Sequence, residues 1–398
     1  MAWYNIRYNI KEVVYVMKQK PILLIRNVAH FEYGGAEKYQ LELAKLLKKN
    51  NLTPIILSSS KRLIQNARLE NIQSHKSLWW SRQNWSGHRN ALLPLYFLWQ
   101  IVLALQYFYL ISKFHPKILQ IQNRDDMLAG TIIGRLTGTN VIWVDHADLR
   151  ETWQNVHAKF KNPIGKLILK LSKHVYKIIT VSQFEYDYLK KSLKNNLPKQ
   201  LIVIKNGVID QKYQFASKTK KTATTNLCFI GRPTQQKGIQ ELLDAFEQLS
   251  KEYRGLKLNI CGSSPEEVYW KRYVNNSQII FHGYLENRLD ILSKSDIFLL
   301  PTYKEGLSLS LIEACMMQKT IIATDVDGNP EIIKNEKTGL LIPPRNKQAL
   351  ISAVKKLLKN PDLCQSLAKA ARKTYKQDFD LEVIVRTQII PLYDKIES

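Results

Sequence analysis

Cysteine is scarce in this chain, with four residues among 398. No two of them have the spacing of a metal-binding or redox-active motif, so neither kind of site is predicted. They lie far apart in apolar or helical contexts, which favours reduced cysteines in a cytosolic protein. No secretory signal is predicted in residues 1–20 either, because they mix charges and tyrosines with short apolar stretches. The cysteines are Cys228, Cys261, Cys315 and Cys364.

Acidic residues are few as well: 34 Asp and Glu stand against 59 Lys and Arg, which gives a net charge of +25. The imbalance is uneven, with 30 basic and 12 acidic residues in 1–200 but 29 and 22 in 201–398. A basic first half predicts an anionic partner, either phospholipid headgroups or nucleic acid. The alternative is that the lysines merely cover solvated faces.

One uncharged stretch, residues 91–111, is about as long as a membrane-spanning helix. Pro94 and two glutamines interrupt it, and its many aromatics are typical of an interfacial or core helix. It also leads directly into a strand at 117–122 that the first domain needs. We therefore expect a helix packed on a sheet, partly resting on a bilayer, rather than a span.

The length suits two domains, and the sequence contains no low-complexity segment or internal repeat. Short apolar runs alternate with helical patterns, which predicts α/β architecture with parallel sheets. We expect a first Rossmann-like domain at 1–207, a linker at 208–225, a second such domain at 226–378, and a C-terminal helix at 379–398 that returns to the first domain. Strands are predicted at 21–28, 53–58, 118–122, 141–144, 178–181, 201–204, 227–230, 256–260, 278–281, 297–300 and 320–323.

Two glutamates stand eight positions apart after one of these strands. Glu305 lies in the loop after residues 297–300, and Glu313 lies in the helix predicted to begin near Leu307 or Ser308. Both carboxylates can face a ligand if the loop folds over the helix start, where free N–H groups and the positive dipole end suit a diphosphate. The alternative is that one is a solvated loop acid and the other a surface helix acid.

Two cations flank a second strand-to-helix loop. Arg232 follows the strand at 227–230, and Lys237 precedes an amphipathic helix. Such a pair suits an anionic leaving group. In a chain this basic, the alternative is two ordinary surface cations.

The motifs together resemble the GT-B retaining glycosyltransferases of family 4, from about residue 21 to the C-terminus and in the order that this family has. One departure is Asp327, which stands where the family usually has the first glycine of a Gly-Gly pair before Pro330-Glu331. The matching residues are Gly34-Gly35-Ala36-Glu37, Val181-Ser182, Asn206-Gly207-Val208, Gly231-Arg232, Lys237-Gly238, His282-Gly283-Tyr284, Glu305-Gly306, Glu313-Ala314, Pro330-Glu331 and Gly339 to Pro344.

The resemblance implies roles for individual residues. Glu313 would bind the ribose hydroxyls of a nucleotide-sugar donor, and Glu305 would bind the donor sugar and stabilise positive charge at its anomeric carbon. Arg232 and Lys237 would neutralise the departing diphosphate in place of a metal, and His146 would lie near the reacting sugar unless it is a core or capping histidine. The rest of the implied donor site is Gly35, Gly283, Gly306, Ser308, Leu309 and Ser310.

The implied enzyme is a retaining hexosyltransferase with two Rossmann-like domains facing across a cleft, no metal or other cofactor, and a UDP- or GDP-sugar as donor. The acceptor would be a saccharide or a lipid-linked molecule of the cell envelope. The protein would be cytoplasmic and peripheral on the inner face of the membrane, without nucleic acid. Alternatives are a sugar-nucleotide epimerase on the same fold, or a basic membrane- or nucleic-acid-binding protein. The second of these is motivated by an aromatic-basic stretch, which consists of Lys76, Trp79, Trp80, Arg82, Trp85 and Arg89.

Overall fold

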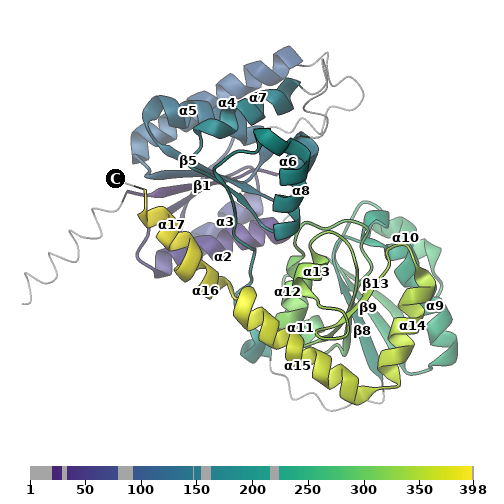
Figure 1. Cartoon of the computed structure of the whole chain (residues 1–398). Helices are drawn as coiled ribbons and strands as arrows, with labels where there is room; N and C mark the ends of the chain where they lie inside the picture. Colours follow the sequence, from purple (N-terminus) through teal and green to yellow (C-terminus); the bar gives the residue numbers. More distant parts are fainter. Residues whose placement is uncertain are drawn as a thin grey trace, which may run out of the picture. The chain divides into compact units, whose positions relative to one another are not determined.

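The computed structural model describes residues 20–28, 34–78, 93–146, 148–153, 163–215 and 224–396, which form two compact α/β units (Figure 1). The first unit comprises Met1–Val181, Tyr186–Ile204 and Val385–Ser398. The second comprises Ser182–Glu185 and Lys205–Ile384. Apart from the short segment Ser182–Glu185, the chain changes unit after Ile204, three residues before the boundary expected at 207, and again after Ile384. The tryptophans of the aromatic-basic stretch lie outside the described residues.

The described part of the first unit contains a parallel sheet of seven strands in the order β3-β2-β1-β4-β5-β6-β7. Its central strands are runs of Ile, Leu and Val buried on both faces, as expected for a parallel sheet covered by helices. The strands are β1 (Ile22–Arg26), β2 (Pro54–Ser58), β3 (Gln73–Lys76), β4 (Ile118–Ile121), β5 (Asn140–Asp145), β6 (Lys177–Thr180) and β7 (Leu201–Val203).

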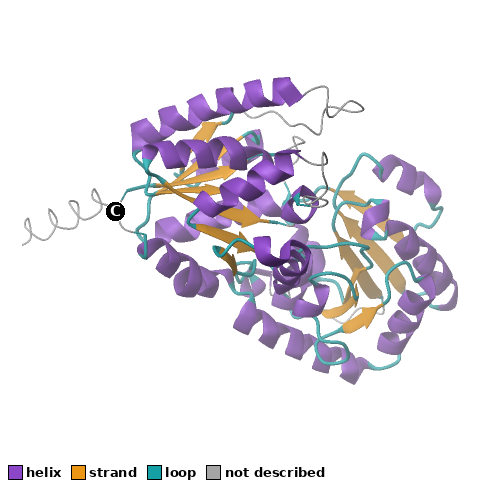
Figure 2. Ribbon diagram, turned by 45° about the horizontal axis from the view of Figure 1, so that its top comes forward, coloured by secondary structure: helices purple, strands orange, loops and turns teal. Residues whose placement is uncertain are grey.

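Helices cover both faces of this sheet (Figure 2). Figure 1 shows α4, α5 and α7 on one face, and α2, α3 and the C-terminal α17 on the other. The Tyr393 hydroxyl on α17 donates a hydrogen bond to the Gln120 side chain on β4, which ties the C-terminal segment to this sheet. The helices are α2 (Gly35–Lys49), α3 (Lys61–Leu69), α4 (Leu93–Phe114), α5 (Arg124–Thr137), α6 (Asp148–Thr152), α7 (Pro163–Leu171), α8 (Gln183–Leu193) and α17 (Ile390–Asp394).

Helix α4 occupies the uncharged stretch singled out in the sequence and is long and apolar enough to cross a membrane. Its inner face nevertheless belongs to the domain, because Leu103 and Tyr107 are fully buried. The Gln100 side chain also binds the first two turns of α5: it donates to the carbonyl of Asp125 at 2.9 Å and accepts from the Ala129 N–H at 3.1 Å. Its outer face is also apolar, whereas a surface helix normally presents polar residues there. The exposed apolar residues of α4 are Leu95, Phe97, Leu98, Ile101, Leu105, Phe108 and Tyr109.

The described part of the second unit contains a parallel six-stranded sheet in the order β10-β9-β8-β11-β12-β13. Its strands are β8 (Thr225–Ile230), β9 (Leu256–Cys261), β10 (Ile279–Gly283), β11 (Ile297–Leu300), β12 (Thr320–Thr324) and β13 (Leu340–Ile342). Its helices are α9 (Ile239–Glu252), α10 (Glu267–Tyr273), α11 (Arg288–Ser293), α12 (Leu309–Met316), α13 (Asn329–Ile332), α14 (Lys347–Leu358), α15 (Pro361–Asp378) and α16 (Leu381–Ile384).

The C-terminal residues form a broken helix. After α16, residues Val385–Ile389 make one π-helical stretch, and α17 follows. The first residues of the expected linker are also structured, because Val208 forms a β-bridge with Asp380 and Asp210 pairs with Arg372 of α15. Two distant parts of the chain, 208–212 and 372–384, are thus held together within the second unit.

Candidate functional site

Three glycines line the carboxyl ends of adjacent strands in the second unit. A Cβ atom on Gly262, whose φ is +141°, would lie 2.0 Å from the carbonyl oxygen of Gly231. The Gly262 N–H donates to the carbonyl of Gly283 at 2.8 Å, and Gly283 has a φ of +64°. The backbone is therefore bare at the edge where ligands bind in parallel α/β sheets.

The loops after β8 and β11 are locked together. Gly238 has a φ of +69°, and a Cβ atom there would lie 1.9 Å from the carbonyl oxygen of Pro301. The Tyr303 N–H donates to the carbonyl of Gln236 at 2.9 Å. This contact brings Lys237 beside Glu305, and the two side chains form an ion pair at 21% and 16% exposure. One predicted cation and one predicted carboxylate therefore meet at the same edge of the sheet.

Asp327 holds the backbone of the Glu305 loop. The Glu305 N–H donates to the Asp327 carboxylate at 3.1 Å. Asp327 has a φ of +47°, the left-handed region that glycine adopts freely and aspartate tolerates. Its neighbour Gly328 packs so closely that a Cβ atom there would lie 2.0 Å from the carbonyl oxygen of Gly306. The aspartate thus adopts a backbone conformation that glycine reaches without strain, and its side chain adds a hydrogen bond to the loop.

Helix α12 begins at Leu309, one or two residues later than expected, and Ser308 is its N-cap. The Ser308 hydroxyl accepts from the Leu311 N–H at 3.3 Å and contacts the Ser310 hydroxyl at 3.2 Å. The N–H groups of Leu309 and Ser310 belong to the first turn, where a helix has no partner of its own for them. This end of α12 therefore offers donors and a positive dipole end to an anion.

Glu313 is buried in α12 and pairs with Arg288, the first residue of α11. Arg288 Nε and Nη2 donate to the two carboxylate oxygens of Glu313 at 3.0 and 2.7 Å. With Glu305 also half-buried, neither glutamate is a solvated surface acid. The sequence did not single out Arg288, because nothing in its neighbourhood marks a partner 25 positions away.

Arg232 is exposed just beyond the end of β8. Within the described residues its side chain makes no ion pair or hydrogen bond, in contrast to Lys237. The two cations expected to act together therefore differ: one is bound to Glu305 and the other extends into solvent. Over the same described residues, no group of three or more His, Cys, Asp and Glu side chains could hold a metal ion.

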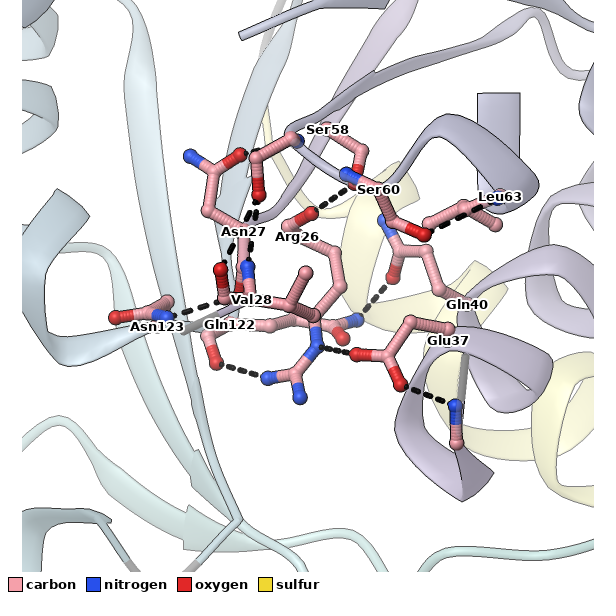
Figure 3. A network of polar contacts seen from close by, with 12 residues as sticks. Arg26, Asn27, Val28, Glu37, Gln40, Ser58, Ser60, Leu63, Gln122 and Asn123 are labelled. Carbon is pink, nitrogen blue, oxygen red and sulfur yellow. Dashed lines mark hydrogen bonds and ion pairs between the residues drawn. The ribbon is translucent and has the colours of Figure 1, made fainter. Parts of the chain in front are cut away.

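The Gly34-Gly35 loop of the first unit opens α2. The Glu37 carboxylate accepts from the Gly34 N–H and from Arg26 Nε, both at 2.8 Å. Arg26 also donates to the backbone carbonyl of Gln122 at 3.0 Å, so it joins the ends of β1 and β4 (Figure 3). Glu37 is buried while Gly34 and Gly35 are exposed, so this network fixes a bare backbone segment at the start of a 15-residue helix.

His146 follows β5 in the first unit and lies edge-on to Tyr39, with 6.0 Å between ring centroids. Burial, and then the positive charge of Arg26, lower the pKa of His146 to about 3. Its imidazole is therefore neutral at physiological pH and can act through hydrogen bonds rather than through a fixed charge.

The predicted residues thus divide between the units. Arg232, Lys237, Gly283, Glu305, Gly306, Ser308, Leu309, Ser310 and Glu313 follow the carboxyl ends of strands in the second unit, and Gly35 and His146 do so in the first. Each group sits where a parallel α/β sheet binds its ligands. The fold and these sites define a two-domain α/β protein of the class that binds its ligands at the carboxyl ends of parallel strands.

Family models agree with this class. The model for glycosyltransferase family 4 matches residues 33–212, and the model for glycosyl transferases group 1 matches residues 210–374. The chain belongs to the GT-B glycosyltransferases of family 4.

Individual proteins are related to this chain at low sequence identity. It is 26% identical over 276 residues to the glycogen synthase of Mycobacterium tuberculosis, a match that covers 68% of this chain and 64% of that protein. It is 27% identical over 243 residues to the N,N'-diacetylbacillosaminyl-diphospho-undecaprenol alpha-1,3-N-acetylgalactosaminyltransferase of Campylobacter jejuni, with 58% and 63% covered. HepE of Anabaena, solved in complex with UDP-glucose, has the same fold, with a TM-score of 0.75 at 16% identity over 94% of this chain and 99% of that one.

Proposed function

We propose that this protein transfers a hexose-type sugar from a UDP- or GDP-sugar to a hydroxyl group of its acceptor, with retention of configuration. The proposal is carried by one observation: Glu305 with Lys237, the capped start of α12, and Glu313 with Arg288 lie at one edge of the second sheet. Anionic, cationic and N–H groups gathered in this way match the parts of a nucleotide-sugar.

The donor occupies this edge as follows. Its diphosphate binds the first turn of α12 and the cations Arg232 and Lys237. Its ribose hydroxyls bind Glu313, and a hydroxyl of its sugar binds Glu305. The glycines before these loops, with Gly283 among them, let the backbone approach the nucleotide. Gly35 has the role that its motif implies: because it has no side chain, a phosphate group can approach its backbone closely.

The reaction exchanges one bond for another at the anomeric carbon. The bond from that carbon to the diphosphate oxygen breaks, and the acceptor oxygen forms its bond on the same face. The proton of the acceptor hydroxyl passes to an oxygen of the departing diphosphate. Glu305 stabilises the positive charge that develops on the carbon, while Arg232 and Lys237 stabilise the negative charge that develops on the leaving group. We assign no step to a metal, and His146 contributes a neutral hydrogen-bonding group near the sugar.

The acceptor belongs to the cell envelope, as a saccharide or a lipid-linked molecule, and the enzyme acts from the cytoplasm on the inner face of the membrane. The name of the Campylobacter relative, which specifies an undecaprenol-linked acceptor, supports this proposal. So does the apolar outer face of α4 in the basic half of the chain.

A panel of nucleotide-sugars tests the proposal. Each UDP- and GDP-hexose is incubated with the protein alone, and the release of UDP or GDP is measured. With the active donor and an acceptor, NMR of the product then reads the anomeric configuration. We expect slow hydrolysis of the donor in the first assay. In the second assay we expect a product with the same anomeric configuration as the donor. Inversion would contradict retention, and conversion of one nucleotide-sugar into another without an acceptor would indicate an epimerase.

A further inference from the structure

The ion pair of Arg288 and Glu313 is more enclosed than a surface pair. The Glu313 side chain is 3% exposed and that of Arg288 is 17% exposed. Both carboxylate oxygens accept from the guanidinium, which lies side-on to the carboxylate. Because an isolated carboxylate is costly to bury, the guanidinium compensates the buried carboxylate of Glu313 and sets its plane.

The geometry of this pair determines how Glu313 can bind a second partner. An ionised carboxylate has four acceptor positions on its two oxygens, and the fork of Arg288 takes one on each. The remaining positions keep the direction that the pair imposes. Two adjacent hydroxyls of a ribose ring are spaced to donate to two oxygens held in this way.

The charge of Arg288 matters as much as its shape. Glu313 is five positions from Ser308, the cap of the α12 end that we assign to the diphosphate. An uncompensated carboxylate so close to that end would repel the diphosphate across a poorly solvated distance. Arg288 cancels this charge without withdrawing the carboxylate oxygens from the site.

We propose that Arg288 is a positioning residue that gives the donor site its selectivity for ribose over deoxyribose. The inference rests on the proposed function, because it takes Glu313 to be the acceptor of the ribose hydroxyls. Arg288 acts through Glu313 and touches neither the sugar nor the breaking bond. Its loss therefore lowers nucleotide affinity and selectivity more than it changes the chemical step.

Calorimetric titration with UDP, 2′-deoxy-UDP, GDP and 2′-deoxy-GDP tests the inference. For the base that the wild-type protein accepts, we expect the ribonucleotide to bind about tenfold tighter or more, as for a hydrogen bond to a charged group. Arg288→Gln removes the charge and the fork, and the ratio should fall to roughly threefold or less. Arg288→Lys keeps the charge but not the fork and should fall in between.

Lys294→Gln is the matched control. Lys294 directly follows α11 and pairs with Asp290 of that helix, but both side chains are about half-exposed, so the nucleotide ratio should stay at the wild-type value. A folded Arg288→Gln protein with the wild-type ratio would overturn this inference alone. A wild-type protein without a ribose preference, or without nucleotide binding, would overturn the role of Glu313 and this inference with it.

Discussion

The two glutamates of the proposed donor site, Glu305 and Glu313, pair with different cations. Glu305 pairs with Lys237 in a loop, and its backbone is fixed by Asp327. Glu313 pairs with Arg288 inside a helix. Neutralising each glutamate separately therefore tests two different contributions to turnover.

Glu305→Gln should lower kcat by about 10²-fold or more, as expected for a single electrostatic group in a preorganised site. The reason is that it removes negative charge beside a carbon that becomes positive only in the transition state. Glu313→Gln should instead raise the KM for the donor, since ribose does not change during the reaction and its lost binding is uniform. Arg232→Ala should resemble Glu305→Gln, because charge also grows on the diphosphate.

Steady-state kinetics on each variant, with thermal melting as the check of folding, separates these outcomes. Lys356→Gln serves as the control, because it breaks an exposed ion pair with Glu336 on the same unit. A folded Glu305→Gln protein with near-wild-type kcat would show that the assigned transition-state role is wrong.

Gly238→Ala should destabilise the protein far more than Gly138→Ala. Both glycines have a φ near +70°, but a Cβ on Gly138 meets nothing within 4 Å, whereas one on Gly238 meets the Pro301 carbonyl. Gly138→Ala should therefore cost only the left-handed backbone strain, about 1 kcal/mol of unfolding free energy. Gly238→Ala should cost roughly 2 kcal/mol more, because the two loops must separate.

Calorimetric unfolding of the two variants beside the wild-type protein checks this difference. Gly238→Ala should also lose activity, since the same contact places Lys237 beside Glu305. Equal melting temperatures for the two variants would mean that the loops after β8 and β11 are not held together as described.

At the scale of elements, the outer face of α4 should bind anionic membranes. Figure 1 shows α4, α5 and α7 in one layer. In that layer Leu105 of α4 is 65% exposed and Leu136 of α5 is 75% exposed. Lys166, Lys170 and Lys173 are exposed at helical spacing along α7 and the turn after it. Apolar residues flanked by lysines are the composition of an interfacial surface.

Co-sedimentation with phosphatidylglycerol vesicles should therefore recover the protein at low salt. Neutral phosphatidylcholine vesicles should recover less. Salt should weaken the binding as the screening length falls from about 10 Å at 0.1 M to about 3 Å at 1 M. Leu105→Gln should reduce binding several-fold by removing apolar contact.

Leu69→Gln is the control for this experiment. Leu69 is 82% exposed on α3, which covers the opposite face of the same sheet. Its loss should leave vesicle binding unchanged. Equal partitioning into neutral and anionic vesicles, or an equal effect of both substitutions, would contradict docking by the α4 face.

The sequence predicted the elements whose side chains are buried on both faces. Runs such as residues 297–300 form strands within one or two residues of the expected bounds, because a buried parallel strand needs a continuous apolar run. Two edge strands were not predicted: β3 (Gln73–Lys76), whose polar sequence has no such pattern, and β13 (Leu340–Ile342), whose apolar run is only three residues long. The π-helical conformation of residues Val385–Ile389 was not predicted either, because the spacing of their apolar residues is that of an ordinary α-helix.

The candidate site was predictable in part. Glu305 and Glu313 share one loop and helix, so their spacing could be judged from the sequence. Their partners Lys237 and Arg288 stand 68 and 25 positions away in the sequence, and the fold brings them together. Lys237 was found through its motif, whereas Arg288 stands in no motif. Pairings of this kind depend on the order of the strands, which local sequence does not encode.

At the scale of the whole molecule, turnover should not depend on a divalent cation. Arg232, Lys237 and the α12 end can supply the positive charge that a metal supplies elsewhere. Donor hydrolysis should therefore persist in excess EDTA and should not rise when Mn²⁺ or Mg²⁺ is restored.

The loop after β12 provides the sharper variant, because Asp325 and Asp327 stand two positions apart there, as in metal-binding Asp-x-Asp pairs. Asp325 is exposed, so Asp325→Asn should keep full activity. This account of the leaving group would be overturned if the wild-type protein strictly required a metal and Asp325→Asn abolished that metal-dependent activity.

The last turns of the chain complete the first unit, not the second. Ile389, Tyr393 and Ile396 are buried there, far in sequence from the strands they cover. On the ribosome, the second unit can therefore close as soon as residue 384 has emerged. The first unit, although translated earlier, keeps part of its apolar surface open until residues 385–396 have also emerged. Loss of those residues is consequently a folding defect of the half made first, and a chain released at residue 384 should expose the α2 and α3 side of its older half to proteases and chaperones.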